Sequence, residues 1–304
     1  MSGGGGARAP LTLAVDLGGT HMRCAIVSAS GEVTDRREAP TARDGTGTAP
    51  LVSLIRTVAA LAPCQSAVMG VPGRVDYREG RLEEAANLPP DWLPGLTSSA
   101  LGAAVGLPVA LANDADLAAV GEAYFGAGQA YGDVAYITLS TGVGAGVVLG
   151  GALVHGRRSM AEVGHQVIAL GRQPDTLEDL ASGTALGRAA AAAGIGVRGQ
   201  DVVDAVAAGN PAAARIWDDL VAAAAVGLVN LAWAFSPEVI VIGGGLGLVG
   251  PVLLDPLRAA MQREGPPALD PPIAIVAAAL GDDAGLAGAG AWARAFHAPP
   301  SGRS

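Results

Sequence analysis

Two glycine-rich stretches of this chain each follow one apolar run and precede another. They are Asp16-Leu17-Gly18-Gly19-Thr20 and Ser140-Thr141-Gly142-Val143-Gly144-Ala145-Gly146. Main chain without side chains can approach a phosphate closely, and its successive N–H groups then form an anion-binding concavity. The pair of stretches therefore predicts two loops that hold the phosphates of a nucleotide. The residues predicted to do so are Gly18, Gly19, Thr20, Thr141, Gly142 and Gly144.

An Asn113-Asp114 pair lies between the two loops, where a predicted strand over 109–112 meets a predicted helix over 115–125. A fixed carboxylate at such a point can take the proton from an alcohol that attacks a phosphorus atom. An Asp before a helix can also serve as its N-cap, and both roles are compatible. The pattern predicts that Asp114 is the general base of a phosphoryl transfer.

Asp16 ends a strand-like run directly before the first loop. We expect it to hold Mg²⁺ through water, because Mg²⁺ keeps much of its hydration shell. The alternative is an ordinary tight hairpin with a buried Asp, which would need a partner. Arg23 either steers phosphate charge or is an exposed strand arginine. Gly243, Gly244 and Gly245 follow a buried strand over 239–242 and are predicted to lie against the adenosine.

Strand-like runs alternate with helical spacing along the chain, which makes the class α/β. The two related halves are expected to face a cleft. We expect a small α/β domain over 1–112 plus 284–304 and a large one over 113–283, with 1–10 a disordered tail. The expected strands are 11–15, 22–28, 67–71, 109–112, 134–139, 145–149 and 239–242. The expected helices are 50–61, 96–105, 115–125, 181–234 with breaks near Gly194 and Gly209, and 284–296.

The composition excludes several functions. All 19 basic residues are arginine, so the lysine of a Walker-type loop and any Schiff-base lysine are absent. The net charge of −9 argues against a nucleic-acid surface. No apolar run of membrane-spanning length is uninterrupted, and the glycine-rich start lacks the apolar core of a signal peptide. With only Cys24 and Cys64, a disulfide framework is not expected and the cytoplasm is the predicted compartment.

The order of the motifs over roughly residues 11–297 resembles that of the ROK family, and in particular its bacterial glucokinases. The resemblance implies the actin-like, ribonuclease H-like ATPase fold, with ATP and a sugar bound in the interdomain cleft, and a homodimer. The motifs that carry it are Asp16 to Thr20, Gly70-Val-Pro-Gly73, Asn87-Leu-Pro89, Ala112-Asn-Asp114, Ser140 to Gly144, Glu162-Val-Gly-His165, Leu177-Glu178 and Gly243 to Gly245.

The resemblance also implies which residues contact the sugar: Gly73, Asn87, Asn113, Asp114, Glu162, His165 and Glu178. Each has a simpler interpretation as well. Asn87 before Leu-Pro is ordinary loop chemistry, and Glu162 with His165 could form a solvated turn. Glu178 could be a first-turn helix glutamate.

The sequence departs from the family at a zinc-binding cysteine loop, which many ROK kinases carry after the Glu-x-Gly-His unit. No cysteine lies between His165 and Glu178, so no structural zinc is expected. The carboxylates of Asp175, Glu178 and Asp179 crowd this remodelled segment. They could suit an aminated sugar such as kanosamine or glucosamine, or form a solvated acidic turn.

The function predicted is an ATP- and Mg²⁺-dependent kinase that phosphorylates the 6-hydroxyl of glucose or a glucose derivative. The alternative is a kinase specific for a modified hexose or cyclitol, and a more remote one is a non-catalytic sugar-sensing ROK protein. A ROK repressor is disfavoured, because only 15 residues precede Asp16 and no DNA-binding helix-turn-helix is expected. The partners predicted are a small-molecule sugar and ATP, with no nucleic acid and no membrane.

Overall fold

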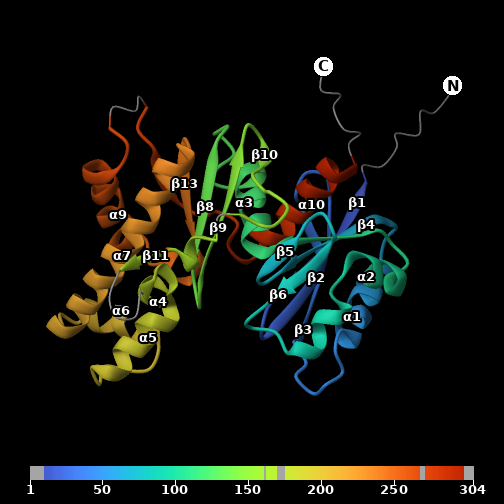
Figure 1. Ribbon diagram of the computed structural model, residues 1–304, viewed down its shortest axis with the longest axis horizontal. Helices are drawn as coiled ribbons and strands as arrows, with labels where there is room; N and C mark the ends of the chain where they lie inside the picture. The colour runs from blue at the N-terminus through green and yellow to red at the C-terminus, as the bar shows by residue number, and fades with distance from the viewer. Residues whose placement is uncertain (1–9, 161, 170–174, 268–270, 298–304) are drawn as a thin grey trace. The chain divides into compact units, whose positions relative to one another are not determined.

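The computed structural model describes residues 10–160, 162–169, 175–267 and 271–297, which form two compact units (Figure 1). The first unit contains the described residues of Met1–Phe125, His155–Ser159 and Asp282–Ser304. The second contains those of Gly126–Val154 and Met160–Gly281. The expected domain boundary fell between residues 112 and 113, whereas these contacts assign the helix after residue 113 to the first unit. Most of the tail expected over 1–10 lies outside the described residues.

The first unit is built on a five-stranded sheet with the order β3-β2-β1-β4-β7. β1 pairs antiparallel with β2 and parallel with β4, while β3 is antiparallel to β2 and β7 parallel to β4. β1 is buried along most of its length because both faces of the sheet are covered. The strands are β1 Leu11–Leu17, β2 His21–Val27, β3 Val33–Pro40, β4 Cys64–Val71 and β7 Val109–Asn113.

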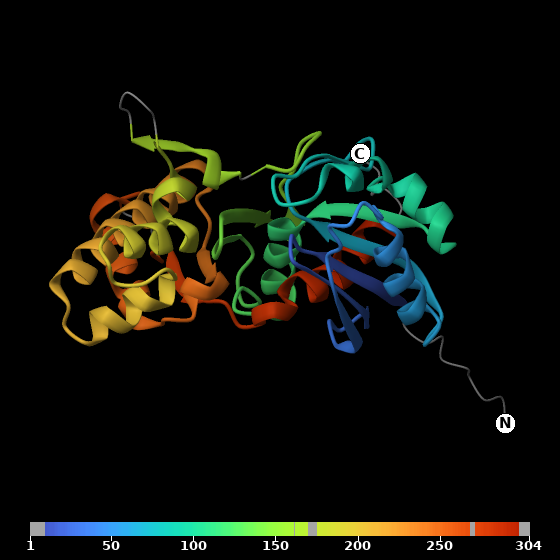
Figure 2. The ribbon, with the colours of Figure 1, turned by 90° about the horizontal axis from the view of Figure 1, so that it is seen from below.

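Alternate residues of this sheet belong to two separate apolar clusters. Leu13 and Val15 share a cluster with Leu51 of α1 (Ala49–Ala59), and α2 (Ser98–Val105) contributes to the same cluster. Ala14 instead shares a cluster with Leu286 of α10 (Ala284–His297), together with residues of α3 (Asp114–Phe125). The period-2 alternation of a strand therefore places helices on both faces of the sheet, as Figure 2 shows.

A second chain segment, residues 155–159, crosses back onto the first unit beside the short hairpin of β5 (Arg74–Asp76) and β6 (Arg81–Glu84). Tyr77 N–H donates to the Arg157 carbonyl at 2.9 Å, and Ser159 N–H donates to the Val75 carbonyl at 3.2 Å. The buried Asp76 carboxylate pairs with Arg157 Nε at 2.9 Å. The segment is thus held by both main-chain and side-chain bonds. A 3-10 helix over Pro90–Gly95 (η1) follows the hairpin.

The second unit repeats the topology of the first. Its sheet has the order β10-β9-β8-β13-β14, again with two antiparallel pairs followed by two parallel ones. This identical order and direction supports the duplication expected from the two glycine loops. The strands are β8 Val134–Leu139, β9 Val143–Leu149, β10 Ala152–Leu153, β13 Val239–Gly243 and β14 Ala274–Ala277.

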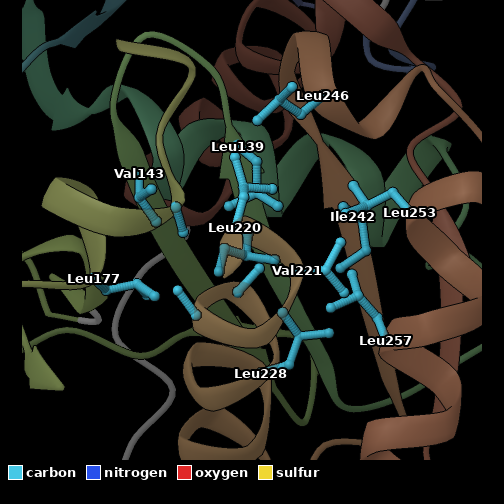
Figure 3. Close-up of a cluster of buried hydrophobic side chains, with 14 of the residues drawn as sticks. Leu139, Val143, Leu177, Leu220, Val221, Leu228, Ile242, Leu246, Leu253 and Leu257 are labelled. Carbon is cyan, nitrogen blue, oxygen red and sulfur yellow. The ribbon is translucent and has the colours of Figure 1, made fainter. Parts of the chain in front are cut away.

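The core of the second unit forms where α7 (Pro211–Phe235) and α9 (Pro251–Glu264) pack against its sheet and against each other. Leu220 and Leu228 of α7 belong to one buried cluster with Ile242 of β13 (Figure 3). Within the described residues, α7 is the one helix long and apolar enough to cross a membrane by length and composition. Ten of its residues are nevertheless buried in this unit, as in the core helix of a globular domain.

The remaining elements of the second unit surround the second glycine loop and the helical region. They are the 3-10 helix η2 Val163–His165, β11 Val167–Ala169, β12 Asp175–Thr176, α4 Leu177–Ala181, α5 Gly183–Ala192, α6 Gly199–Ala207 and α8 Gly244–Gly247. Part of the expected long helical region, 181–234, is thus confirmed as α5, α6 and α7, with its breaks near Gly194 and Gly209.

Candidate active site

In the first unit, predicted site residues gather at one edge of the sheet. The carboxyl ends of the parallel strands β1, β4 and β7 lie together there, with Asp16 beside Gly70 and Gly70 beside Ala112. This edge is the usual ligand-binding edge of a parallel sheet. Asp16, Gly73 and Asn113 each lie at or just beyond the end of one of these strands. Asp114 begins the helix that follows.

The first glycine loop is a tight hairpin closed by its own main chain. Gly18 N–H donates to the His21 carbonyl at 2.8 Å, and Thr41 Oγ1 donates to the Gly18 carbonyl at 2.7 Å. A Cβ on Gly19 would lie 2.9 Å from the Asn87 carbonyl oxygen, so only glycine allows this approach. Among the described residues, none accepts a hydrogen bond from Gly19 or Thr20 N–H. Two donors of this loop thus remain for an anion.

Arg43 joins the glycine loop to the Asn87 segment. Its Nη2 donates to the Gly19 carbonyl at 2.8 Å and to the Asn87 carbonyl at 2.9 Å. The loop predicted to hold phosphate and the loop predicted to hold sugar therefore share one guanidinium group. Sequence reasoning missed Arg43, because no motif marks an arginine in a loop between a strand and a helix.

Asp16 has the partner that a largely buried carboxylate requires. Arg23 Nη1 lies 3.2 Å from Asp16 Oδ2, and Arg23 also approaches Glu38 and Asp282. Burial raises the pKa of Asp16, and the charge and hydrogen bond of Arg23 oppose that rise. A single carboxylate beside a phosphate loop fits Mg²⁺, which binds through one or two carboxylates plus phosphates rather than in a protein cage. No three His, Cys, Asp or Glu side chains form such a cage in the described parts of the chain.

Asn113 caps helix α3 with its side chain. Asn113 Oδ1 accepts hydrogen bonds from Ala115 N–H at 2.9 Å and Asp116 N–H at 3.1 Å. Its Nδ2 donates to the Gly73 carbonyl at 3.0 Å. These bonds give the buried Asn113 a structural role, and the N-cap function considered for Asp114 falls mainly to its neighbour.

Asp114 is the first residue of α3 and is half-buried. Its Oδ1 accepts a hydrogen bond from Ala115 N–H at 2.8 Å. This bond holds the carboxylate at the start of α3, at the carboxyl edge of the first sheet.

In the second unit, the turn between β8 and β9 forms the second glycine loop. Ser140 N–H donates to the Gly142 carbonyl at 2.9 Å, and Gly183 N–H donates to the Ser140 carbonyl at 2.6 Å. Thr184 Oγ1 donates to the Thr141 carbonyl at 2.7 Å. Gly144 continues into β9 opposite Thr138. The first residues of α5 therefore fix this loop by hydrogen bonds to its main-chain carbonyls.

Glu178 of α4 also touches the second glycine loop. Its Oε2 accepts a hydrogen bond from Val143 N–H at 2.8 Å. The predicted sugar contact thus has a bond to the predicted phosphate loop within one unit. The neighbouring Asp179 caps α4 by bonding Thr176 N–H and Oγ1, and these bonds lower its pKa.

Glu162 precedes the 3-10 helix η2 and His165 is its last residue, and η2 contacts β9 and α4. Glu162 is half-buried and His165 is exposed. Gly164 between them lies directly against the Val143 carbonyl. The segment from Glu162 to His165 is therefore brought to the second glycine loop. Residues 170–174, in the remodelled segment where a zinc loop is not expected, lie outside the described residues.

Gly243 and the two glycines after it lie at the carboxyl end of β13, which runs parallel to β8. Gly243 pairs with Thr138, so this turn and the second glycine loop share one edge of the sheet. Gly244 has φ +77°, and a Cβ there would meet the Leu139 carbonyl, so the turn requires glycine. Gly245 has no atom within 4 Å of where its Cβ would lie. It offers bare main chain as a surface for a flat ligand.

Two α/β units with the same sheet order, each with a glycine loop between its first two strands, define the actin-like ATPase fold. The sequence profile of the ROK family matches residues 12–295. The chain belongs to the ROK family.

Three curated relatives illustrate the range of the family near this chain. A bifunctional enzyme NanE/NanK of Brucella melitensis is 38% identical, over 91% of this chain and 52% of the relative, so the chain spans about half of its length. A glucokinase of Halalkalibacterium halodurans is 32% identical over 91% of this chain and 92% of the relative. An N-acetylmannosamine kinase of Yersinia pseudotuberculosis is 32% identical over 93% and 98%, respectively.

Solved structures share the architecture. A ROK family glucokinase from Streptomyces griseus, in complex with glucose and AMPPNP, has a TM-score of 0.77 and 33% identity. The similarity covers 94% of this chain and 99% of that one. A ROK hexokinase from Thermus thermophilus has a TM-score of 0.80 and 30% identity, over 95% of this chain and all of the other.

Proposed function

We propose that this protein is an ATP-dependent sugar kinase that transfers the γ-phosphoryl group to the 6-hydroxyl of glucose or a glucose derivative. The observation that carries the proposal is the position of Asp114. It begins α3 at the carboxyl edge of the first sheet, the same edge at which β1 leads into the Gly18-Gly19 turn. In this proposal Asp114 accepts the proton of the attacking hydroxyl.

The protein's part in phosphoryl transfer is mainly positioning and charge neutralisation. The N–H groups of Gly19 and Thr20, and those of Thr141 and Gly142, would bind phosphate oxygens of ATP. Gly243 to Gly245 would receive the adenosine. Asp16 would hold Mg²⁺ through water, and the bound ion would neutralise charge on the phosphates.

The sugar would be held by Gly73, Asn87, Asn113, Asp114, Glu162, His165 and Glu178. For Asn113 only one amide hydrogen is left for a sugar hydroxyl, because its Oδ1 accepts two main-chain hydrogen bonds and its Nδ2 donates one to the Gly73 carbonyl. Glu178 would use the carboxylate oxygen that does not bond Val143. Asp114 would therefore make the main contact of this group to the reacting hydroxyl.

Two different sugar classes deserve testing beside glucose. The N-acetylmannosamine kinase relative, which aligns over nearly its whole length, supports an N-acetylated hexosamine. The carboxylates of Asp175, Glu178 and Asp179 suggested an amino sugar. Two of these three already have main-chain partners, Glu178 at Val143 and Asp179 at Thr176, which weakens the case for a bound amine.

Measurement of ADP release with a panel of sugars tests the proposal. The panel contains glucose, mannose, fructose, N-acetylglucosamine, N-acetylmannosamine, glucosamine and kanosamine, each with MgATP. We expect a hexose to give the highest kcat/KM, and Asp114→Asn to lower kcat by about 10²–10⁴-fold while sugar binding persists in calorimetry. An Asp114→Asn enzyme with undiminished kcat would remove the assigned base. If none of these sugars is phosphorylated, the result would favour a sugar-sensing protein without catalytic activity.

A further inference from the structure

Tyr77 reaches the start of the helix that carries Asp114, although it belongs to a different part of the chain. It follows β5 in the hairpin region of the first unit, 37 positions before Asp114 in sequence. Its hydroxyl accepts a hydrogen bond from Asn113 N–H at 3.1 Å. The same hydroxyl donates to Asp116 Oδ2 at 2.6 Å. One phenol group therefore binds residues on both sides of Asp114.

These two bonds constrain the first turn of α3. Asn113 N–H belongs to the end of β7, and the fully buried Asp116 carboxylate belongs to the first turn of the helix. Asn113 Oδ1 already caps that turn from within the chain. The tyrosine adds a bridge to this turn from another part of the chain.

The ring of Tyr77 is itself fixed by packing. It lies 4.8 Å from the His155 ring and 5.6 Å from the Trp292 ring, measured between centroids. His155 belongs to the crossing segment and Trp292 to α10, so two further parts of the first unit hold the phenol in place. The Tyr77 main-chain N–H also bonds the Arg157 carbonyl. The hydroxyl is therefore presented to α3 from a well-supported side chain.

We propose that Tyr77 is a positioning residue that aims the Asp114 carboxylate at the attacking sugar hydroxyl. The inference rests on the proposed role of Asp114 as base, and it adds a residue that does not touch the sugar. A reacting group held about 1 Å out of place can cost about 10²-fold in rate, so a bridge across the residues flanking Asp114 has a measurable effect. Because Tyr77 itself contacts neither substrate in this proposal, binding of sugar and nucleotide should change little without the bridge.

Tyr77→Phe tests this inference because it removes only the hydroxyl and keeps the ring. We expect kcat for sugar phosphorylation to fall by about 10-fold, with KM for sugar and for ATP changed less than about 2-fold. Slow ATP hydrolysis without sugar should keep its wild-type rate. In this proposal only the bound sugar hydroxyl requires an accurately placed Asp114 carboxylate, whereas a mobile water molecule does not. Tyr124→Phe, at the far end of α3, makes the same chemical change as a control and should leave kcat unaltered.

The outcomes separate this inference from the proposed function. A Tyr77→Phe enzyme with wild-type kcat would overturn the inference, and so would an equal loss of phosphorylation and hydrolysis, which indicates a merely structural role. An active Asp114→Asn enzyme would instead remove the base itself. If Tyr77→Phe does not fold, Asp116→Asn tests the same bridge, because it replaces the carboxyl group that accepts the hydroxyl's hydrogen bond by an amide. A smaller fall in kcat, about 3-fold, with unchanged hydrolysis supports the inference, and no fall overturns it.

Discussion

Glu178 on α4 accepts a hydrogen bond from the Val143 main-chain N–H, with 2.8 Å between Oε2 and the nitrogen. One carboxylate thus ties the helix that follows the remodelled segment to the second glycine loop. If Glu178 also contacts sugar, one carboxylate oxygen accepts from Val143 N–H and the other accepts from a sugar hydroxyl. The loop predicted to bind phosphate would then depend on the same side chain as sugar recognition.

Glu178→Ala and Glu178→Gln separate the two roles of this carboxylate. Alanine leaves Val143 N–H without its acceptor, so we expect KM to rise for both ATP and sugar, by about 10-fold each. Glutamine keeps an amide oxygen for Val143 but loses the charge, so KM should rise mainly for sugar. Initial rates with each substrate varied in turn measure both constants. Equal ATP constants for the two variants would contradict a role of Glu178 in holding the loop.

Gly19→Ala should weaken nucleotide binding, because the new Cβ would lie 2.9 Å from the Asn87 carbonyl oxygen and push the loop away from it. We expect KM for ATP to rise by about 10-fold or more, since a 1 Å shift of the loop misplaces its N–H donors. Titration with a non-hydrolysable ATP analogue measures the affinity directly. Gly285→Ala in α10 is the matched control, because no atom lies within 4 Å of that Cβ.

The Asp76–Arg157 pair predicts a pH dependence of stability. Burial alone would raise the pKa of Asp76, but bonds from Glu79 N–H, Arg157 and Arg78 N–H lower it below 3.8. A carboxyl with a depressed folded-state pKa stabilises the fold above its unfolded pKa, and this contribution is lost as the pH falls below that value. Asp76→Asn should therefore lower Tm at pH 7.

The difference in Tm between wild type and Asp76→Asn should shrink as the pH is lowered from about 5 towards 3. Thermal unfolding followed by circular dichroism at several pH values measures it. A difference that stays constant over this range would mean that the pair does not contribute through ionisation. Sodium chloride at high concentration should change the difference little, because Asp76 is buried.

Asn210→Ala should destabilise the second unit by about 0.5–2 kcal/mol, the usual cost of losing an N-cap. Asn210 Oδ1 accepts hydrogen bonds from Ala212 and Ala213 N–H at the start of α7. Asn230→Ala on the same helix removes only an exposed bond to Gln166 and should cost less than about 0.5 kcal/mol. Urea unfolding measures the loss of unfolding free energy in both variants. Equal losses would contradict the expected contribution of the N-cap.

The strands and helices that lead into the glycine loops could be predicted because their apolar residues are continuous or have helical spacing. β1, β7, β8 and β13 are buried on both faces, so their sequences are nearly unbroken apolar runs. β3 gave no such signal, because it is mostly exposed and carries Asp35, Arg36, Arg37 and Glu38. Its pairing with β2 depends on main-chain bonds, which leave no hydropathy pattern.

The candidate residues could be proposed from motif order, but their bonding could not. Asn113 was expected to bind sugar, and its side chain caps α3 and bonds Gly73. Tyr77 and Arg43 act on residues 36 and 44 positions away, for Asn113 and Asn87 respectively. Contacts between residues so far apart in sequence arise from packing at the edge of the sheet. No local pattern in a single sequence predicts them.

The covering of β1 by α10 has a consequence for synthesis on the ribosome. Ala14 is translated long before Leu286, which belongs to the same apolar cluster. The part of the sheet face that α10 covers therefore stays open until α10 has been synthesised, whereas α3 can pack there earlier. The second unit, whose segments end at Gly281, can close before the unit that contains β1. A chaperone that binds apolar nascent chain could therefore reach strand residues such as Ala14, Ala25 and Val68 until α10 packs against them.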